Sequence, residues 1–187
     1  MGSNKESIKH KYHKKTHYLE DGALVIHVSD YVKNPDALFN ELLTSIPWTR
    51  FTYRVYDKDV LSPRLMQIVE MKDVVELPHL KEIKERLEKV CKVKFKYAVL
   101  NYYRDGNDHI SYHSDREVEH GKMVASVSLG QTRRFVLRHK GNKNKVVFEP
   151  KHGDVLILND AAINFVYKHR VPKMKNAKAR INITFRQ

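Results

Sequence analysis

The chain of 187 residues carries a formal net charge of +13, and 41% of its residues are hydrophobic. That hydrophobic content supports a packed domain and excludes a disordered polypeptide. Its single cysteine excludes an intrachain disulfide and favours an intracellular compartment, the nucleus or the cytoplasm. No apolar run reaches the roughly 18 residues of a membrane span, so we expect no membrane partner. The excess charge favours nucleic acid as a partner, with a merely solvated basic surface as the alternative.

The predicted elements follow one another in a simple order. The first part of the chain predicts a flexible basic tail, a strand, a helix begun by proline and an aromatic strand or hairpin arm, over residues 1–16, 23–28, 34–47 and 48–56. An amphipathic helix is predicted over residues 78–92, because apolar residues recur there at helical spacing. About seven short strands follow from residue 95 onwards. One α+β domain over residues 17–187 is therefore predicted, a β-sandwich or jelly roll backed by helices.

Three residues of the strand-rich part form a candidate metal site. His113 and Asp115 end an extended run two positions apart, so their side chains can share one face. His169 comes four predicted strands later. Two imidazoles and one carboxylate hold non-haem Fe(II) and leave three positions open for a co-substrate and O2. The same ligands also serve catalytic zinc, although no clear helical His-Glu-x-x-His motif accompanies them.

A second His-x-Asp pair competes for the same third ligand. His152 and Asp154 flank Gly153 directly before an apolar strand. This position predicts a turn in which Asp154 accepts backbone hydrogen bonds. We therefore assign His169 to the first pair.

The last predicted strand alternates polar and apolar residues. Its polar positions share one face, and they are Arg180, Asn182, Thr184 and Arg186. Two arginines that face a buried site need an anion, and a dicarboxylate co-substrate meets that need. Asn101 and Tyr103 alternate in the same way on an earlier strand. A solvated basic edge strand is the alternative interpretation.

Taken in order, these motifs resemble the AlkB family of Fe(II)- and 2-oxoglutarate-dependent nucleic-acid dealkylases. The resemblance covers about residues 35–187 and rests on six blocks, at residues 101–106, 113–115, 126–130, 152–154, 169 and 180–186. Residues 134–140 look closest to the eukaryotic-type DNA-repair branch. The resemblance implies a double-stranded β-helix, with a nucleotide-recognition lid and the first helix over about 17–77 and the second helix and jelly roll over about 78–187.

The resemblance also implies a reaction. Fe(II) would be held by His113, Asp115 and His169, with 2-oxoglutarate and O2 as co-substrates. Arg180 and Tyr103 would take the distal carboxylate of 2-oxoglutarate, and the rest of its site would be Asn101, Asn182, Thr184 and Arg186. A monomer would demethylate bases such as 1-methyladenine and 3-methylcytosine in DNA or RNA, releasing formaldehyde, succinate and CO2. The alternative is an oxygenase that hydroxylates a protein or a small molecule.

Candidate substrate contacts lie on both sides of the iron motif. Tyr56 stands where repair-type relatives carry an aromatic finger that fills the gap left by a flipped base, with an ordinary strand tyrosine as the alternative. Arg138 and Lys140 belong to a basic region suited to phosphates, and Arg64 and Glu117 complete the candidate substrate contacts.

Two departures from the family concern the base. Arg64 precedes residues 65–72, which lack the aromatic-glycine segment that stacks on the base in relatives. Arg116 stands where relatives carry an acid, and Glu117 follows as in them. The resemblance therefore leaves the base and the choice between DNA and RNA open.

Overall fold

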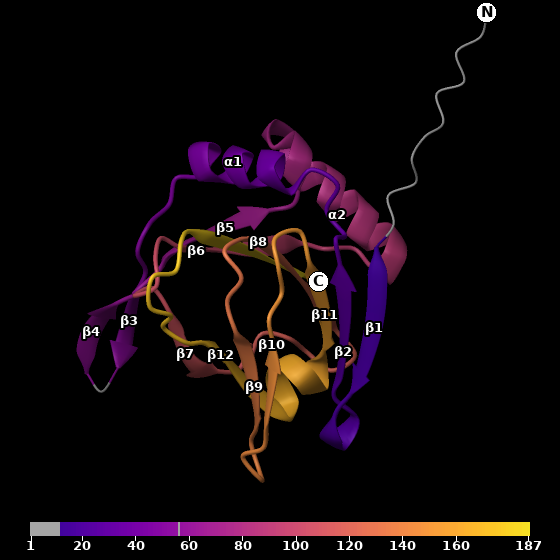
Figure 1. The fold of residues 1–187 in the computed structure, drawn as a ribbon, viewed down its shortest axis with the longest axis vertical. Helices are drawn as coiled ribbons and strands as arrows, with labels where there is room; N and C mark the ends of the chain where they lie inside the picture. Colours follow the sequence, from indigo (N-terminus) through magenta and orange to yellow (C-terminus); the bar gives the residue numbers. More distant parts are fainter. Residues whose placement is uncertain (1–11, 56) are drawn as a thin grey trace, which may run out of the picture.

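The computed structural model describes residues 12–55 and 57–187, which form two antiparallel sheets, a hairpin and two α-helices (Figure 1). In spatial order the seven-stranded sheet contains β1 (His13–Tyr18), β2 (Leu24–Ser29), β11 (Val155–Asn159), β8 (Met123–Gly130), β13 (Arg180–Arg186), β6 (Tyr97–Tyr103) and β5 (Leu65–Glu70). The four-stranded sheet contains β10 (Lys145–Phe148), β9 (Phe135–His139), β12 (Tyr167–Val171) and β7 (Ile110–His113). Two such sheets make the jelly roll that the strand pattern predicts.

The remaining elements connect or cover the sheets. The hairpin pairs β3 (Thr52–Val55) with β4 (Lys58–Leu61) and projects from one side of the molecule in Figure 1. The α-helices are α1 (Pro35–Ser45) and α2 (Pro78–Cys91), and the short helical turns are η1 (Glu20–Gly22), η2 (Val74–Glu76) and η3 (Ala161–Phe165). None of the helices within the described ranges is long and apolar enough to cross a membrane.

Two apolar cores hold the layers together. The first joins the two α-helices to the seven-stranded sheet, with Leu42 of α1 and Ile83 of α2 packed near Ile183 of β13. The second lies between the sheets, where Leu158 of β11 and Leu137 of β9 are both fully buried. Because β13 turns its apolar residues to the first core, its polar residues face the space between the sheets.

The prediction of a flexible tail over residues 1–16 is wrong at its C-terminal end. Residues 13–18 form β1, which pairs along its whole length with β2, from His13 opposite Ser29 to Tyr18 opposite Leu24. The strand is polar because it lies at the edge of the sheet. Residues 1–11 lie outside the described part of the chain.

Two other elements differ from their predicted boundaries. One of the seven short strands expected after residue 95 was predicted over residues 164–171. It begins only at Tyr167, because Ala161–Phe165 form a turn of π-helix. β5 (Leu65–Glu70) was not predicted as a strand, and it pairs with β6 from Leu65 opposite Tyr102 to Glu70 opposite Tyr97. The predicted helices match the structure closely. So do the strands predicted over residues 23–28, 95–103, 123–130 and 179–186, which are β2, β6, β8 and β13.

Candidate metal centre

Two adjacent strands and one loop bring the predicted ligands together. His113 of β7 lies directly opposite His169 of β12 in the four-stranded sheet. Asp115 lies just beyond the end of β7, where its backbone N–H donates to the carbonyl of Ile163 at 3.2 Å. The turn of π-helix that replaces the first residues of the predicted strand thus also fixes the loop that carries the carboxylate.

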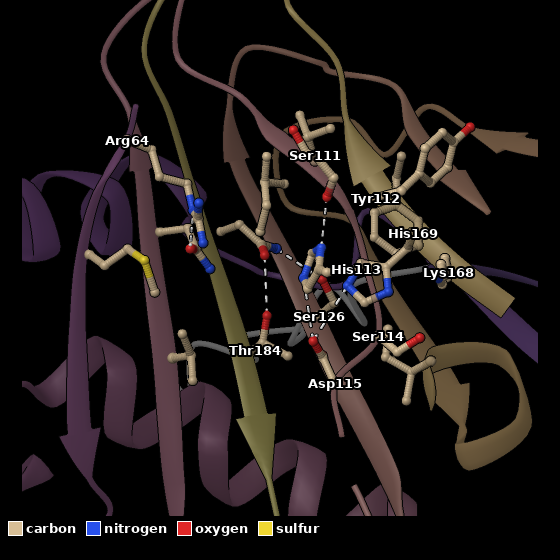
Figure 2. A pocket seen from close by; sticks show the side chains of 18 of the residues that line it. Arg64, Ser111, Tyr112, His113, Ser114, Asp115, Ser126, Lys168, His169 and Thr184 are labelled. Atoms are coloured by element: carbon tan, nitrogen blue, oxygen red, sulfur yellow. Dashed lines mark hydrogen bonds and ion pairs between the residues drawn. The ribbon is translucent and has the colours of Figure 1, made fainter. Parts of the chain in front are cut away.

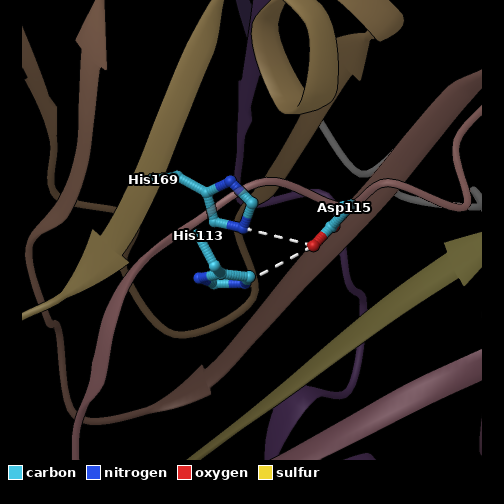
Figure 3. Close-up of side chains that lie close together, drawn as sticks. All are labelled: His113, Asp115 and His169. Atoms are coloured by element: carbon cyan, nitrogen blue, oxygen red, sulfur yellow. Dashed lines mark ion pairs between the residues drawn. The ribbon is translucent and has the colours of Figure 1, made fainter. Parts of the chain in front are cut away.

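The three side chains converge on one point (Figure 3). Oδ1 of Asp115 lies 3.4 Å from Nε2 of His113 and 3.5 Å from Nε2 of His169. One ligand atom from each residue lies within 4.8 Å of the other two. Among the described residues, no other group of histidine, cysteine and acidic side chains converges in this way. The two-nitrogen, one-oxygen set suits Fe(II).

Burial and charge set the protonation of two ligands. Burial of Asp115 disfavours the carboxylate, but a hydrogen bond with His113 and nearby charges outweigh it and lower its pKa to about 2. Burial lowers the pKa of His169 to about 4, against the opposing attraction of Asp115. At neutral pH the carboxylate is therefore ionised and the His169 imidazole neutral, which are the forms that coordinate a metal.

Further contacts orient the ligands. Nη2 of Arg186 donates to Oδ2 of Asp115 at 2.9 Å, which leaves Oδ1 directed at the two imidazoles. Nη1 of Arg186 pairs with the carboxylate of Glu117. Nδ1 of His113 lies 2.9 Å from the carbonyl of Ser111, so a proton on Nδ1 would leave Nε2 free to coordinate.

The cluster opens into a cavity of about 1250 Å³ between the sheets. Figure 2 shows Arg64 and Thr184 on one side of the histidines and Lys168 and Tyr112 on the other. Five of the six residues predicted to hold 2-oxoglutarate line it, namely Asn101, Tyr103, Asn182, Thr184 and Arg186. The alternation predicted for β13 is confirmed, and the register sets Asn182 opposite Asn101.

The sixth predicted residue, Arg180, lies behind Tyr103. Its guanidinium carbon is 5.3 Å from the ring centroid of Tyr103, and it is not part of the cavity wall. Arg180 is 2% exposed, and Nη2 donates to Oγ of Ser128 at 3.0 Å. Nε and Nη1 are buried without a hydrogen-bond partner among the described residues. Burial lowers the pKa of this arginine, which means that its charged form is poorly solvated there. A bound anion would offset this desolvation penalty.

A family model described as the 2OG-Fe(II) oxygenase superfamily matches residues 64–186. The chain belongs to this superfamily. The match spans the complete ligand set, both faces of the cavity and the arginine strand β13.

Relatives of known name bear out the resemblance to the AlkB family. The chain is 38% identical over 122 residues to human "DNA oxidative demethylase ALKBH2", covering 59% of this chain and 46% of that protein. It is 29% identical over 178 residues to mouse "Alpha-ketoglutarate-dependent dioxygenase alkB homolog 3", covering 83% of this chain and 62% of that protein. The chain spans about half the length of the ALKBH2 proteins of cattle, mouse and human.

Solved structures support the fold of the oxygenase. "The structure of OsALKBH1" superposes with a TM-score of 0.57 at 19% identity, covering 92% of this chain and 100% of that one. A "2OG-Fe(II) oxygenase family" oxidoreductase from Burkholderia pseudomallei superposes with a TM-score of 0.60 at 17% identity, covering 87% of this chain and 84% of that one.

The residues of this chain fit the iron and the co-substrate of the superfamily. Three ligand atoms converge with the right donor types, and unpaired guanidinium donors lie buried behind one end of the cavity. A dicarboxylate requires such donors, whereas zinc hydrolysis does not. The competing pair is a turn, as predicted: Asp154 accepts from the backbone N–H of Lys151 at 2.9 Å and of Asp30 at 3.1 Å.

The candidate substrate residues divide into three groups. Arg64, Glu117 and Lys140 line the cavity. Arg138 does not line it but stacks on the neighbouring ring of Tyr112. Tyr56 lies outside the described residues, so its role stays a prediction.

Two features of the site were not predicted from the sequence. Ser126 of β8 lines the cavity, and its Oγ accepts from Nδ2 of Asn182 at 2.9 Å; the alternation of serine and valine along β8 was the signal. Arg133 is 1% exposed and donates to the carbonyls of Asp105, Asp108 and Pro172, with its guanidinium carbon 5.6 Å from the Tyr103 ring centroid. No local pattern in the sequence predicts these contacts, because the carbonyls belong to the β6–β7 and β12–β13 connections.

Proposed function

We propose that the protein is a dioxygenase that oxidatively demethylates N-alkylated bases, of the 1-methyladenine and 3-methylcytosine type, in DNA or RNA. The observation that carries this proposal is the pair of donors on buried Arg180 that have no partner among the described residues, beside Tyr103 in the wall of the cavity that also holds the His-Asp-His cluster. Fe(II), when bound with 2-oxoglutarate and O2, would supply the oxidation of the methyl carbon, with formaldehyde, succinate and CO2 as products.

The residues of the cavity would bind and orient the co-substrate. Arg180 and Tyr103 would hold its distal carboxylate, because Tyr103 lines the cavity and Arg180 beside it carries buried donors without a partner among the described residues. Asn101, Asn182 and Thr184 would supply neutral hydrogen bonds along the wall. Arg186 would orient Asp115 and keep positive charge beside the metal ligands.

The wide mouth of the cavity would receive a flipped or single-stranded base. Residues 17–77 would supply a lid, since Arg54 and Leu61 of the β3–β4 hairpin and Arg64 after it line the cavity. Glu117 would face the base edge, and Arg138 and Lys140 would contact phosphates. Tyr56 would act as the finger that fills the gap left by a flipped base. We further infer a monomer that works where nucleic acid is, in the nucleus or the cytoplasm.

The proposal is tested with a panel of methylated single- and double-stranded DNA and RNA oligonucleotides. Full-length protein with Fe(II), ascorbate and 2-oxoglutarate is expected to remove the methyl group from at least one member, as read by mass spectrometry of the bases. Turnover of 2-oxoglutarate without any change in the oligonucleotides would overturn the proposal. Hydroxylation of a peptide or small molecule in the same assay would instead favour a different oxygenase.

A further inference from the structure

The outer face of the four-stranded sheet carries a row of cations. Lys145 of β10 lies directly opposite Arg138 of β9, and Arg138 lies directly opposite Lys168 of β12. Neighbouring strands lie about 4.8 Å apart, and like charges set directly opposite each other destabilise a sheet. Stability alone therefore does not explain this row.

The row lacks acidic partners. Within the described ranges, no ion pair involves Arg138, Lys145, Lys168 or Arg170, although other arginines and lysines do pair with carboxylates. Strand alternation explains the position of the cations, because Leu137 and His169, the neighbours of Arg138 and Lys168, are buried on the inner side. The charges thus remain available to an external anion.

A tyrosine orders two of these cations. The guanidinium carbons of Arg138 and Arg170 lie 4.0 Å and 4.6 Å from the ring centroid of Tyr112. Nε of Arg170 is buried without a hydrogen-bond partner among the described residues. Stacking fixes the planes of both guanidiniums, so less side-chain entropy is lost when an anion binds.

The cations continue into the cavity mouth. Lys168 and Tyr112 line the cavity together with Lys140 and Arg116. Figure 2 shows Lys168 and Tyr112 beyond His169, on the side away from Arg64. Burial lowers the pKa of Lys140, and so do the charges of Lys168 and Arg116, which act at short range on the same ammonium group. One continuous positive field thus joins the outer face of the sheet to the candidate metal centre.

We propose that this face, made of Arg138, Lys145, Lys168, Arg170 and Tyr112, binds the sugar-phosphate backbone of a single nucleic-acid strand and leads it to the cavity. The inference rests on the proposed function, which supplies nucleic acid as the substrate. A polynucleotide fits better than a lone phosphate, because the cations lie on successive strands and a polyanion releases a counterion at each one.

The test is the salt dependence of binding to an unmethylated, fluorescently labelled single-stranded oligonucleotide, measured by anisotropy without iron. The variant Arg138→Gln/Lys168→Gln/Arg170→Gln removes three cations from the face. Its plot of log affinity against log salt is expected to flatten by about 2, since each phosphate contact in a single strand contributes a slope of about 0.7.

A matched control separates local contacts from net charge. Lys33→Gln/Lys81→Gln/Lys89→Gln removes three exposed cations from around the helices and is expected to keep the slope of the wild type. Equal flattening in both triple variants, or none in the first, would overturn the inference. If the first triple variant does not fold, the exposed single change Lys168→Gln is expected to flatten the slope by about 0.7, and an unchanged slope counts against the face.

The tyrosine has its own pair of variants. Tyr112→Phe keeps the ring and is expected to bind like the wild type, whereas Tyr112→Leu is expected to bind about threefold more weakly or worse. Equal affinities of the two variants would refute the stacking role. Phosphatidylserine vesicles serve as the other polyanion: loss of vesicle binding with unchanged oligonucleotide binding in the first triple variant would make the face a membrane site instead.

The inference and the proposed function fail separately. Altered salt slopes in a protein that demethylates nothing would leave the face intact and remove the proposed function. Conversely, the first triple variant could keep the wild-type salt slope and demethylate both a methylated trinucleotide and a long oligonucleotide at wild-type rates. That result would refute only the binding role of this face.

Discussion

Replacing Arg180 should weaken the binding of 2-oxoglutarate and leave the stability of the free protein nearly unchanged. In the variant Arg180→Met, two buried donors disappear that have no partner in the described part of the chain, together with one hydrogen bond to Ser128. A charge-assisted hydrogen bond contributes about 1.5–3 kcal/mol, so two such bonds to a carboxylate are equivalent to about 100- to 10,000-fold in affinity. The free protein should lose little stability, because the variant also abolishes the burial of an unpaired charge.

The expected size of the effect in a melting experiment follows from mass action. At a 2-oxoglutarate concentration of about 100 times the wild-type dissociation constant, binding raises the free energy of unfolding of the wild type by about 2.7 kcal/mol. A variant that binds about 100-fold more weakly gains only about 0.4 kcal/mol. For a chain of this length the first gain raises Tm by about 5–11 °C and the second by about 1 °C. The measurement is a thermal melt with Mn(II), with and without 2-oxoglutarate.

The control and the refuting results are equally direct. The control is Arg134→Met, which replaces an exposed arginine and should show the full rise in Tm with 2-oxoglutarate that the wild type shows. If Arg180→Met also shows the full shift, its donors do not bind the co-substrate. If instead its Tm without ligand falls by more than about 10 °C, Arg180 stabilises the fold and the reasoning about its unpaired charge is wrong.

Three further predictions concern the metal, a buried carboxylate and a tight turn. His113→Ala should lose Fe(II) after anaerobic loading, as read by metal analysis, whereas Arg180→Met should keep it; equal loss would contradict the assigned roles. Asp154→Asn should lose about 1–3 kcal/mol of unfolding free energy in urea at pH 7. Burial raises the pKa of Asp154, but its hydrogen bonds outweigh burial and hold the pKa below the ordinary value of 3.8. The stabilisation is therefore fully present above that ordinary value and lost as pH falls through the lowered pKa, so the difference between wild type and variant should shrink in acid. Gly130→Ala should cost about 1–3 kcal/mol, since φ is +80° and a Cβ would lie 2.5 Å from the carbonyl oxygen of Ala179; an unchanged Tm would refute this.

The metal ligands were predictable because their chemistry is local. His113 and Asp115 stand two residues apart, and β13 places its polar side chains on one face through simple alternation. The amphipathic pattern of α2 and the proline at the start of α1 likewise depend on near neighbours. Such features need only the spacing of residue types and the period of the element.

The rest depended on partners far away in the chain. β1 is a strand only because β2 offers it a free edge, and its own sequence of lysine and histidine reads as a tail. The π-helix at Ala161–Phe165 takes up the first two residues of the strand predicted over residues 164–171, and it depends on contacts with the loop after β7. The pairing of Arg186 with Asp115 joins β13 to the loop after β7, and no pattern within either segment reveals it.

The most direct test of the whole account is the ratio of two products. With Fe(II), 2-oxoglutarate and a single-stranded oligonucleotide that contains 1-methyladenine or 3-methylcytosine, formaldehyde and succinate should appear in equal amounts. Both should vanish together in Asp115→Ala, which removes the carboxylate shared by the two imidazoles. Succinate without formaldehyde across these substrates, or product formation that persists in Asp115→Ala, would contradict the assignment of this cavity as the demethylation site.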